Sequence, residues 1–401
     1  MALLSVEEAL QHILDGVTPT EPESVAIEQA RGRVLAQPLH ARVTQPPFNS
    51  SAMDGYAVRI ADVAQLPATL AVIGEAAAGH PFSDTVSKGQ AVRIFTGAPV
   101  PEGADAIVIQ ENTERDGASV VVREGTVEMG HIRTRGFDFR EGDTLLDAGR
   151  RLGPREISLA ASMGHGQVAV RRRPAVAILS TGDELVPPGS RLGPGQITAS
   201  NHLGIAALAE TAGAAPQQLG IARDTRADLD AHFARAHGAD VIVTSGGASV
   251  GDHDLVGPVL QDRGMTLAFW NIAMRPGKPL MFGRLGQSRV LGLPGNPVSS
   301  LICTRLFLLP LIRALLGQPA NTEVPVQGRL SVPLEANGPR AHYMRAVSRP
   351  GPDGLALVAP VRSQDSSLLA PLAEADCLLV RDPRAPAAPA GSLVSILPLD
   401  L

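Results

Sequence analysis

The stretch 240–252, DVIVTSGGASVGD, decides the fold, because it joins an apolar run typical of a buried strand to a turn with three glycines. Two other stretches repeat this arrangement: 174–184, PAVAILSTGDE, and 289–297, RVLGLPGNP. In an open α/β sheet such turns gather at the carboxyl ends of the strands, where ligands bind. The sequence therefore predicts an α/β domain with a ligand site built from these turns.

Strands and helices alternate along the same part of the chain. The apolar periodicity predicts strands at 175–179, 218–222, 241–244 and 289–293, and helices at 201–212, 225–236, 254–262 and 297–316. Asn296 and Pro297 suit the N-cap and the first position of the last helix. This alternation is typical of a doubly wound α/β domain.

The flanking regions indicate other kinds of structure. Ser5 and Glu8 form a capping box for a helix ending near Leu14, and a second helix is expected at 28–35. Short β-type runs follow at 70–75, 91–96, 106–111 and 119–123, and again at 324–330, 343–347, 355–358, 377–380 and 393–396. We therefore expect an α/β multi-domain chain with a β-rich inserted domain and an all-β C-terminal domain.

Length and composition narrow the class of protein. A chain of 401 residues is long enough for two to four domains. The net charge of -5, with no basic block beyond Arg171–Arg173, argues against nucleic acid or an anionic membrane as a partner. Cys303 and Cys377 cannot form a disulfide framework, which suits the cytoplasm, and charged residues and a proline interrupt the most apolar stretch, 301–316.

The glycine-rich turns carry side chains that suit phosphate and metal chemistry. Ser180, Thr181 and Gly182 can hold a phosphate through hydroxyl and N–H groups, and the acids that follow can hold a divalent cation. An ordinary β-turn with solvated acids is the alternative. In the stretch 240–252 and just after it, Asp252 and Asp254 suit either a metal or the N-terminal end of a helix. His253 is expected at the surface.

Two further segments can be explained either by a function or by ordinary loop structure. Arg275 and Lys278 lie on a loop stiffened by prolines, which suits an oxyanion, although a lone basic loop is usually solvated. The segment 49–57, NSSAMDGYA, is consistent with a simple Asp-Gly turn. No nucleophile elbow, zinc motif or P-loop is present in the sequence.

Taken together and in order, these segments resemble the MoeA-like family of molybdopterin molybdenumtransferases, whose relatives include the E domain of gephyrin. The matching stretches are 49–58, 95–106, 135–138, 180–186, 244–255, 274–280 and 292–300. The resemblance implies a MogA-like α/β domain and five segments: an N-terminal helix at 1–25, a linking domain at 26–45 and 146–173, a β-rich domain at 46–145, the molybdopterin-binding domain at 174–318 and a β domain at 319–401.

The resemblance also implies a reaction and a partner. Adenylated molybdopterin, supplied by an upstream molybdopterin adenylyltransferase, and molybdate would react with Mg2+ to release AMP and leave molybdenum on the dithiolene. The subunit would form a homodimer whose active site lies between the α/β domain of one copy and the β-rich domain of the other. The alternatives are a molybdopterin adenylyltransferase and a non-catalytic, gephyrin-like scaffold.

The resemblance assigns roles to residues by their positions in the matching motifs. Glu184 and Asp254 would bind the metal, and Arg275, Lys278, Arg345 and Ser366 would bind molybdate. Some relatives have Lys where this chain has Asn271 and Arg275. Arg275 preserves the charge, whereas Asn271 puts in doubt any mechanism that needs a cation there. The expected catalytic residues are Asp54, Thr96, Asp138 and Asp224, and the expected substrate-binding residues are Ser180, Thr181, Gly182, Ser245, Gly246, Gly247, Ser249, Gly251, Pro294, Gly295 and Asn296.

Overall fold

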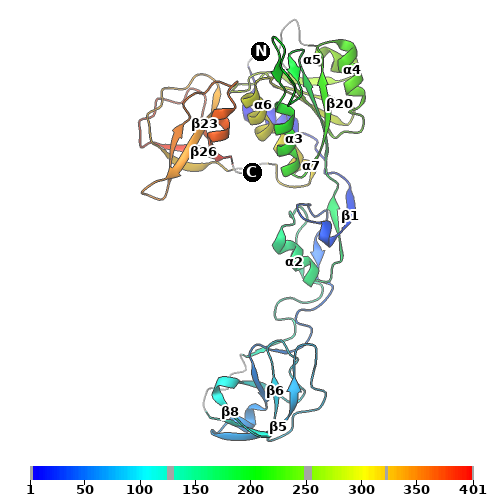
Figure 1. Ribbon diagram of the computed structural model, residues 1–401, viewed down its shortest axis with the longest axis vertical. Coiled ribbons are helices and arrows are strands. Elements are labelled where there is room, and N and C mark those ends of the chain that lie inside the picture. The colour runs from blue at the N-terminus through cyan, green and yellow to red at the C-terminus, as the bar shows by residue number, and fades with distance from the viewer. Residues whose placement is uncertain (1–2, 124–130, 248–254, 321–323, 400–401) are drawn as a thin grey trace. The chain divides into compact units, whose positions relative to one another are not determined.

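The computed structural model describes residues 3–123, 131–247, 255–320 and 324–399 (Figure 1). The chain divides into two compact units. The first comprises residues 1–23, 32–36 and 170–401, and the second comprises residues 24–31 and 37–169. The boundary between them falls within β1 (Pro22–Ala26) and β12 (Gln167–Arg171), so each unit is described by itself.

The first unit contains the predicted α/β sheet. Its strand order is β16-β13-β17-β21-β20-β18, and the first four strands are parallel. The last two pair antiparallel and were not predicted, because neither is followed by a glycine-rich turn and a helix. The bounds are β13 (Ala175–Thr181), β16 (Ala215–Ala222), β17 (Val241–Ser245), β18 (Thr266–Trp270), β20 (Met281–Leu285) and β21 (Ser288–Leu293).

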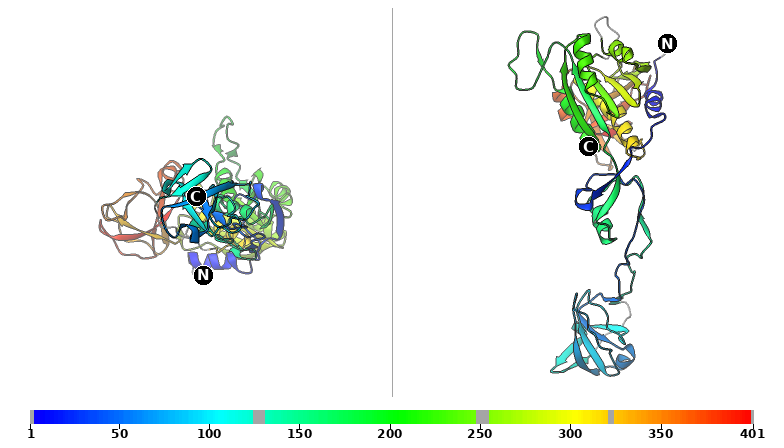
Figure 2. Two further views of the ribbon diagram at one scale, coloured as in Figure 1. Left: turned by 90° about the horizontal axis from the view of Figure 1, so that it is seen from below. Right: turned by 90° about the vertical axis from the view of Figure 1, so that its right-hand side faces the viewer.

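Helices cover both faces of this sheet, which confirms the doubly wound class (Figure 2). Alternate strand residues point to opposite faces, so Ile178 and Val243 join one cluster whereas Leu179 and Ile242 join the other. The first cluster includes residues of α1 (Val6–Leu14), α3 (Asn201–Thr211), α6 (Pro297–Cys303) and α7 (Leu309–Leu315), and the second includes residues of α4 (Arg226–Ala234) and α5 (Val256–Asp262).

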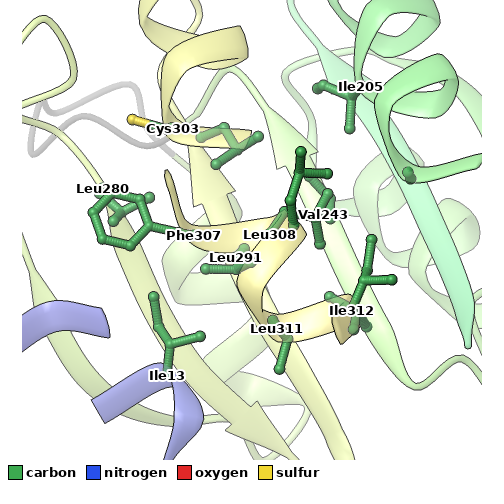
Figure 3. Close-up of a cluster of buried hydrophobic side chains, with 14 of the residues drawn as sticks. Ile13, Ile205, Val243, Leu280, Leu291, Cys303, Phe307, Leu308, Leu311 and Ile312 are labelled. Atoms are coloured by element: carbon green, nitrogen blue, oxygen red, sulfur yellow. The ribbon is translucent and has the colours of Figure 1, made fainter. Parts of the chain in front are cut away.

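The long C-terminal helix of this domain is a core element. A π-helical turn (Thr304–Leu308) joins α6 to α7, and Phe307 and Leu311 are fully buried in the cluster drawn in Figure 3. The span Pro297–Leu315 is apolar enough to cross a membrane, with a hydropathy of 1.7, but 78% of that window is buried inside the protein. Burial of this kind is typical of a helix in the core of a folded domain.

Two predictions near the N-terminus had different outcomes. The capping box is confirmed, because Ser5 Oγ accepts from the Glu8 N–H while Glu8 Oε2 accepts from the Ser5 N–H. The helix predicted at 28–35 is wrong. Only a short 3-10 turn (Ile27–Gln29) forms, because Gly32 adopts a φ of 74° and Leu35 pairs with Val170 as an isolated bridge.

A second sheet in the same unit closes on itself. Its order is β19-β23-β24-β22-β26-β25, and β25 also pairs with β23. The short strand β19 comes from the loop that carries the predicted cations, so this loop is fixed to the C-terminal domain. The bounds are β19 (Met274–Arg275), β22 (Val326–Leu330), β23 (Ala341–Pro350), β24 (Ala356–Pro360), β25 (Cys377–Arg381) and β26 (Leu393–Pro398), with helix α8 at Ala370–Glu374.

The second unit is rich in short strands, as predicted. One six-stranded sheet has the order β7-β4-β6-β5-β9-β8, with β4 (Gly55–Val58), β5 (Ala68–Ala76), β6 (Gln90–Ile94), β7 (Ala106–Ile109), β8 (Thr113–Asp116) and β9 (Ser119–Val122). Two smaller pairs join β2 (Leu39–His40) to β11 (Thr144–Leu146) and β3 (Ser50–Ser51) to β10 (Ile132–Arg133). Helix α2 (Pro154–Ser162) completes the unit.

Candidate functional site

A cleft of about 780 Å³ opens at the carboxyl ends of β13, β17 and β21. Strand β16 lies on one side of β13 and β17 on the other, so the strand order reverses here, which is where open α/β sheets bind ligands. The cleft confirms that the three turns meet in one place. Its lining includes the predicted residues Ser180, Thr181, Gly182, Glu184, Asp224, Ser245, Gly246, Gly247, Pro294, Gly295 and Asn296.

The glycines of the turn that follows β17 allow it to approach the turn that follows β13. Gly246 has a φ of 96°, and a Cβ added there would lie 2.5 Å from the carbonyl oxygen of Thr181. A Cβ on Gly247 would lie 2.3 Å from a methyl group of Val256. Neither position can accept a side chain without moving its neighbours. The glycines therefore set the distance between the turn after β13 and the turn after β17.

The backbone N–H groups of these turns are less available than the sequence suggested. The Gly182 N–H donates to the carbonyl of Ala222, and the Gly246 N–H donates to the carbonyl of Leu293. These two donors therefore hold the turns in place and are not free to bind a phosphate. By contrast, Thr181 is 5% exposed and its Oγ1 has no hydrogen-bond partner among the described residues. A buried hydroxyl of this kind in a cleft is a polar group that a ligand can satisfy.

Asn201 is a site residue that sequence reasoning missed. Its Nδ2 donates to Ser245 Oγ at 2.9 Å and to the carbonyl of Gly295 at 2.8 Å, so one amide joins two turns 50 residues apart in the chain. Asn201 begins α3, and the sequence pattern indicates only its place in that helix. No local pattern marks such a bridge, because the partners come together only in the folded sheet.

Three carboxylates lie close together at one side of the cleft. The Asp224 N–H donates to Asp183 Oδ1 at 3.2 Å, and the pKa of Asp224 is raised by burial and by the nearby charges of Asp183 and Glu184. Hard carboxylate oxygens of this kind suit a divalent cation. However, no group of three His, Cys, Asp or Glu side chains among the described residues is arranged to hold a metal. Asp254 lies outside those residues, as do Ser249 and Gly251.

The C-terminal domain contributes a loop to the same cleft. Ser367 and Leu369 line it, and Ser366 Oγ accepts from Asn296 Nδ2 at 2.9 Å. Asn296 precedes α6 as predicted, but its side chain makes no capping hydrogen bond to that helix, because it reaches the loop instead. Ser366 therefore lies beside the turn that follows β21, although it does not line the cleft itself.

Arg345 holds this loop from behind. Its side chain is buried, and its guanidinium donates to the carbonyls of Ser363, Asp365 and Leu368 at 2.8 to 2.9 Å. An arginine engaged in this way positions the loop and does not present its Nη donors to the cleft. The predicted contact between Arg345 and an oxyanion stays a prediction. Arg275 and Lys278 are exposed and also lie outside the lining of the cleft.

The second unit brings together two of its predicted residues. Asp54 Oδ1 accepts from both the N–H and the Oγ1 of Thr96 at 2.8 Å, and these hydrogen bonds lower the pKa of Asp54. Asp138 is exposed and follows β10, which pairs with the strand that precedes Asp54. Its neighbour Phe137 is 70% exposed. An ionised carboxylate and an exposed aromatic ring are thus placed at the surface of this unit.

Comparisons with known proteins agree along the whole chain. Family profiles match the MoeA N-terminal region (domains I and II) at residues 4–164, a probable molybdopterin binding domain at 177–314 and the MoeA C-terminal region (domain IV) at 327–399. The molybdopterin molybdenumtransferase of Haemophilus influenzae is 35% identical over 99% of both chains. A protein of the same name from Nostoc is 39% identical over 81% of this chain and 76% of its own length.

Solved structures agree with the sequence comparisons. Two crystal structures of the molybdopterin biosynthesis MoeA protein of Pyrococcus horikoshii are similar to this chain, with TM-scores of 0.85 and 0.84 at 29% and 26% identity. They cover 100% and 99% of this chain and the whole of their own. The chain therefore belongs to the MoeA family of molybdopterin molybdenumtransferases, transferases of molybdenum cofactor biosynthesis.

Proposed function

We propose that this protein inserts molybdate into adenylated molybdopterin and releases AMP. The observation that carries the proposal is the cleft at the strand-order reversal, where a buried Thr181 hydroxyl lacks a partner and three carboxylates stand close by. A nucleotide-linked, phosphate-bearing substrate needs polar groups of this kind in a concave site. Membership of a transferase family supports the same assignment.

Each part of the cleft has a task in this proposal. The glycines let the substrate approach the backbone closely. Asn201 holds the turns at Ser245 and Gly295 together through its two hydrogen bonds. Thr181 offers its hydroxyl to a phosphate oxygen. Ser366 and the loop held by Arg345 form the wall on the side of the C-terminal domain.

The carboxylates would hold a divalent cation, Mg2+ in this proposal. Glu184 and Asp254 would be its ligands, with Asp224 beside them. When bound, the cation would neutralise the negative charge on the phosphoanhydride. Burial, and then repulsion by Asp183 and Glu184, raise the pKa of Asp224, and a cation bound nearby would relieve that repulsion.

Asp224→Asn should stabilise the metal-free protein and weaken its response to Mg2+. A carboxyl group with a raised pKa contributes stability that is present at low pH and is lost as the pH rises through that pKa. The neutral amide avoids this loss, so we expect the Tm of the metal-free variant to exceed that of wild type at pH 8 and the difference to shrink towards pH 4. We also expect AMP release to fall by about 10- to 100-fold.

Differential scanning calorimetry with and without Mg2+ tests this prediction. The matched control is Asp262→Asn, an exposed carboxylate paired with Arg226 on the same unit. It should leave the Mg2+ response unchanged. If Asp224→Asn keeps the full increase of Tm with Mg2+, the carboxylates do not form the cation site.

The second unit completes the site in this proposal. We place Asp54, Thr96 and Asp138 of one copy against the cleft of a second copy in a homodimer, with the exposed Phe137 as part of the covering surface. The upstream partner would be the adenylyltransferase that makes the substrate. A reducing cytoplasm suits the two cysteines, which are buried thiols not joined in a disulfide.

AMP release from adenylated molybdopterin, measured with and without molybdate, tests the reaction. We expect release to need both molybdate and Mg2+ and to yield molybdenum bound to the pterin. A molybdopterin adenylyltransferase would instead consume ATP and unmodified molybdopterin, and a scaffold would turn over neither substrate. Either result would contradict the proposal.

A further inference from the structure

Arg93 on β6 contacts the chain next to both Asp54 and Thr96. Its Nη1 donates to the carbonyl of Gly55, the residue that follows Asp54, at 3.1 Å. Its guanidinium also lies over the ring of Phe95, the residue that precedes Thr96, with 4.8 Å between the guanidinium carbon and the ring centroid. One side chain therefore holds the chain beside each member of the hydrogen-bonded pair.

The same guanidinium holds a third segment against Asp54. Arg93 Nη2 donates to Gln110 Oε1 at 2.7 Å, and the Gln110 N–H donates to the carbonyl of Asp54 at 3.1 Å. Tyr56, which pairs in register with Arg93, contacts the guanidinium through its ring, with 5.2 Å between the guanidinium carbon and the ring centroid. Asp54 is thus tied to this arginine through the residue that follows it and through Gln110.

The strand that begins after Asp54 has little room to move. A Cβ added at Gly55 would lie 2.0 Å from the carbonyl oxygen of Val108 on β7. Such a close approach of two strands requires glycine. Strand β4 is therefore fixed against β7, and the Gly55 carbonyl meets Arg93 at a fixed place.

The positive charge of Arg93 acts on Asp54. Among the described residues, no carboxylate forms an ion pair with Arg93, although the exposed Glu75 is its register partner on β5. The pKa of Asp54 is lowered first by the hydrogen bonds from Thr96 and further by the charge of Arg93. Arginine stays protonated at every pH at which a protein is folded. Its charge therefore favours the ionised form of Asp54.

We propose that Arg93 is a positioning residue for the transfer reaction, which holds the Asp54 carboxylate and the Thr96 hydroxyl in the orientation that meets the substrate. Asp54 Oδ1 accepts from both donors of Thr96, whereas Oδ2 has no hydrogen-bond partner among the described residues. Oδ2 and the remaining lone pairs of the Thr96 hydroxyl are thus the acceptors left for a ligand. The inference rests on the proposed function, because that proposal places this pair in the reaction.

The chemistry of this position requires the guanidinium itself. A guanidinium is planar, so it can donate to two acceptors and lie over aromatic rings at the same time. A lysine ammonium keeps the charge but lacks the planar fork. Arg93→Lys should therefore preserve the effect of charge on Asp54 and lose part of the positioning, whereas Arg93→Gln should lose both.

Steady-state kinetics of the full-length variants test the inference. Arg93→Gln should lower kcat for AMP release by about 10- to 100-fold, the usual effect of removing a residue that orients a reacting group. The KM for adenylated molybdopterin should stay close to that of wild type, because Arg93 holds the pair from behind and does not bind the substrate. Arg115→Gln is the matched control, since Arg115 is an exposed arginine on β8, at the edge of the same sheet. It should change neither constant.

Nuclear magnetic resonance of the Asp54 carboxyl carbon gives a second measurement that does not depend on turnover. The Asp54→Asn variant identifies the resonance. Arg93→Gln should raise the pKa of Asp54, because the loss of a nearby positive charge favours the protonated form. Arg93→Lys should keep that pKa near the wild-type value and recover only part of kcat. A merely structural role for Arg93 would not separate the two variants in this way.

The outcomes distinguish this inference from the proposed function. Equal kcat in Arg93→Gln and Arg115→Gln, with an unchanged Asp54 pKa, would overturn the inference and leave the proposed function standing. If the wild type released no AMP, the proposed function would fail, and an unchanged Asp54 pKa in Arg93→Gln would overturn the inference as well. Should Arg93→Gln not fold, wild-type kcat in Arg93→Lys would overturn the inference, because charge alone would then be sufficient.

Discussion

Gly246→Ala is expected to lower AMP release by about 100-fold or more, because a displacement of about 1 Å in a reacting site costs a factor of that size. The added Cβ would lie 2.5 Å from the Thr181 carbonyl oxygen and 2.9 Å from its Oγ1, so the first two turns must separate. That movement displaces the hydroxyl assigned to the substrate. The expected loss therefore follows from the geometry of the cleft and not from any chemistry of glycine itself.

Gly264→Ala separates this effect from backbone strain. Gly264 has the same φ of 96°, but a Cβ there meets no atom within 4 Å. Both variants therefore bear a similar backbone strain of about 1 to 3 kcal/mol at that φ. Only in Gly246→Ala does the added Cβ clash with the turn at Thr181. Single-turnover kinetics and the Tm should be measured for both. Equal activity of the two variants at equal stability would contradict the role given to the second turn.

Mixing two inactive variants, Asp54→Ala and Asp224→Ala, is expected to restore activity. In the proposed homodimer each site takes Asp54 from one copy and Asp224 from the other, so a heterodimer contains one intact site and one site with both changes. Random pairing of equal amounts should recover about a quarter of wild-type turnover. The recovery is large because either change alone should leave almost none.

The control is a mixture of Asp54→Ala with Thr96→Ala. These two residues hydrogen bond to each other within one unit, so every site of that heterodimer lacks one of them. No recovery is expected. Native mass spectrometry should show that heterodimers form in both mixtures. Equal turnover in the two mixtures would mean that the site is not shared between copies.

Local pattern was sufficient to predict most of the elements near the cleft. The apolar runs before each turn became β13, β17 and β21, and the Ser5–Glu8 capping box begins α1 as expected. These features depend on residues only a few positions apart, and backbone sterics act at that range. The failed helix at 28–35 has the same kind of cause, since Gly32 at positive φ interrupts the pattern.

The cleft was predicted in outline because parallel strands bring their carboxyl ends to one edge. The resemblance of the motifs indicated the family, which the comparisons confirm. What the motifs did not indicate is how each polar group is used. The N–H groups of Gly182 and Gly246 hold the fold, and the Nη donors of Arg345 hold a loop, whereas Asn201 joins two turns.

The amino-acid sequence by itself thus determined the parallel strands of the α/β sheet and the turns that follow them, because those depend on short-range periodicity and turn chemistry, and its motifs indicated the family. Only the tertiary structure decided which distant residues meet. The antiparallel edge of the sheet and the pairing of β19 with β23 depend on cross-strand register, and the Asn201 bridge depends on where α3 lies against the sheet. Register is set by the packing of whole sheets against helices, and no local segment encodes it.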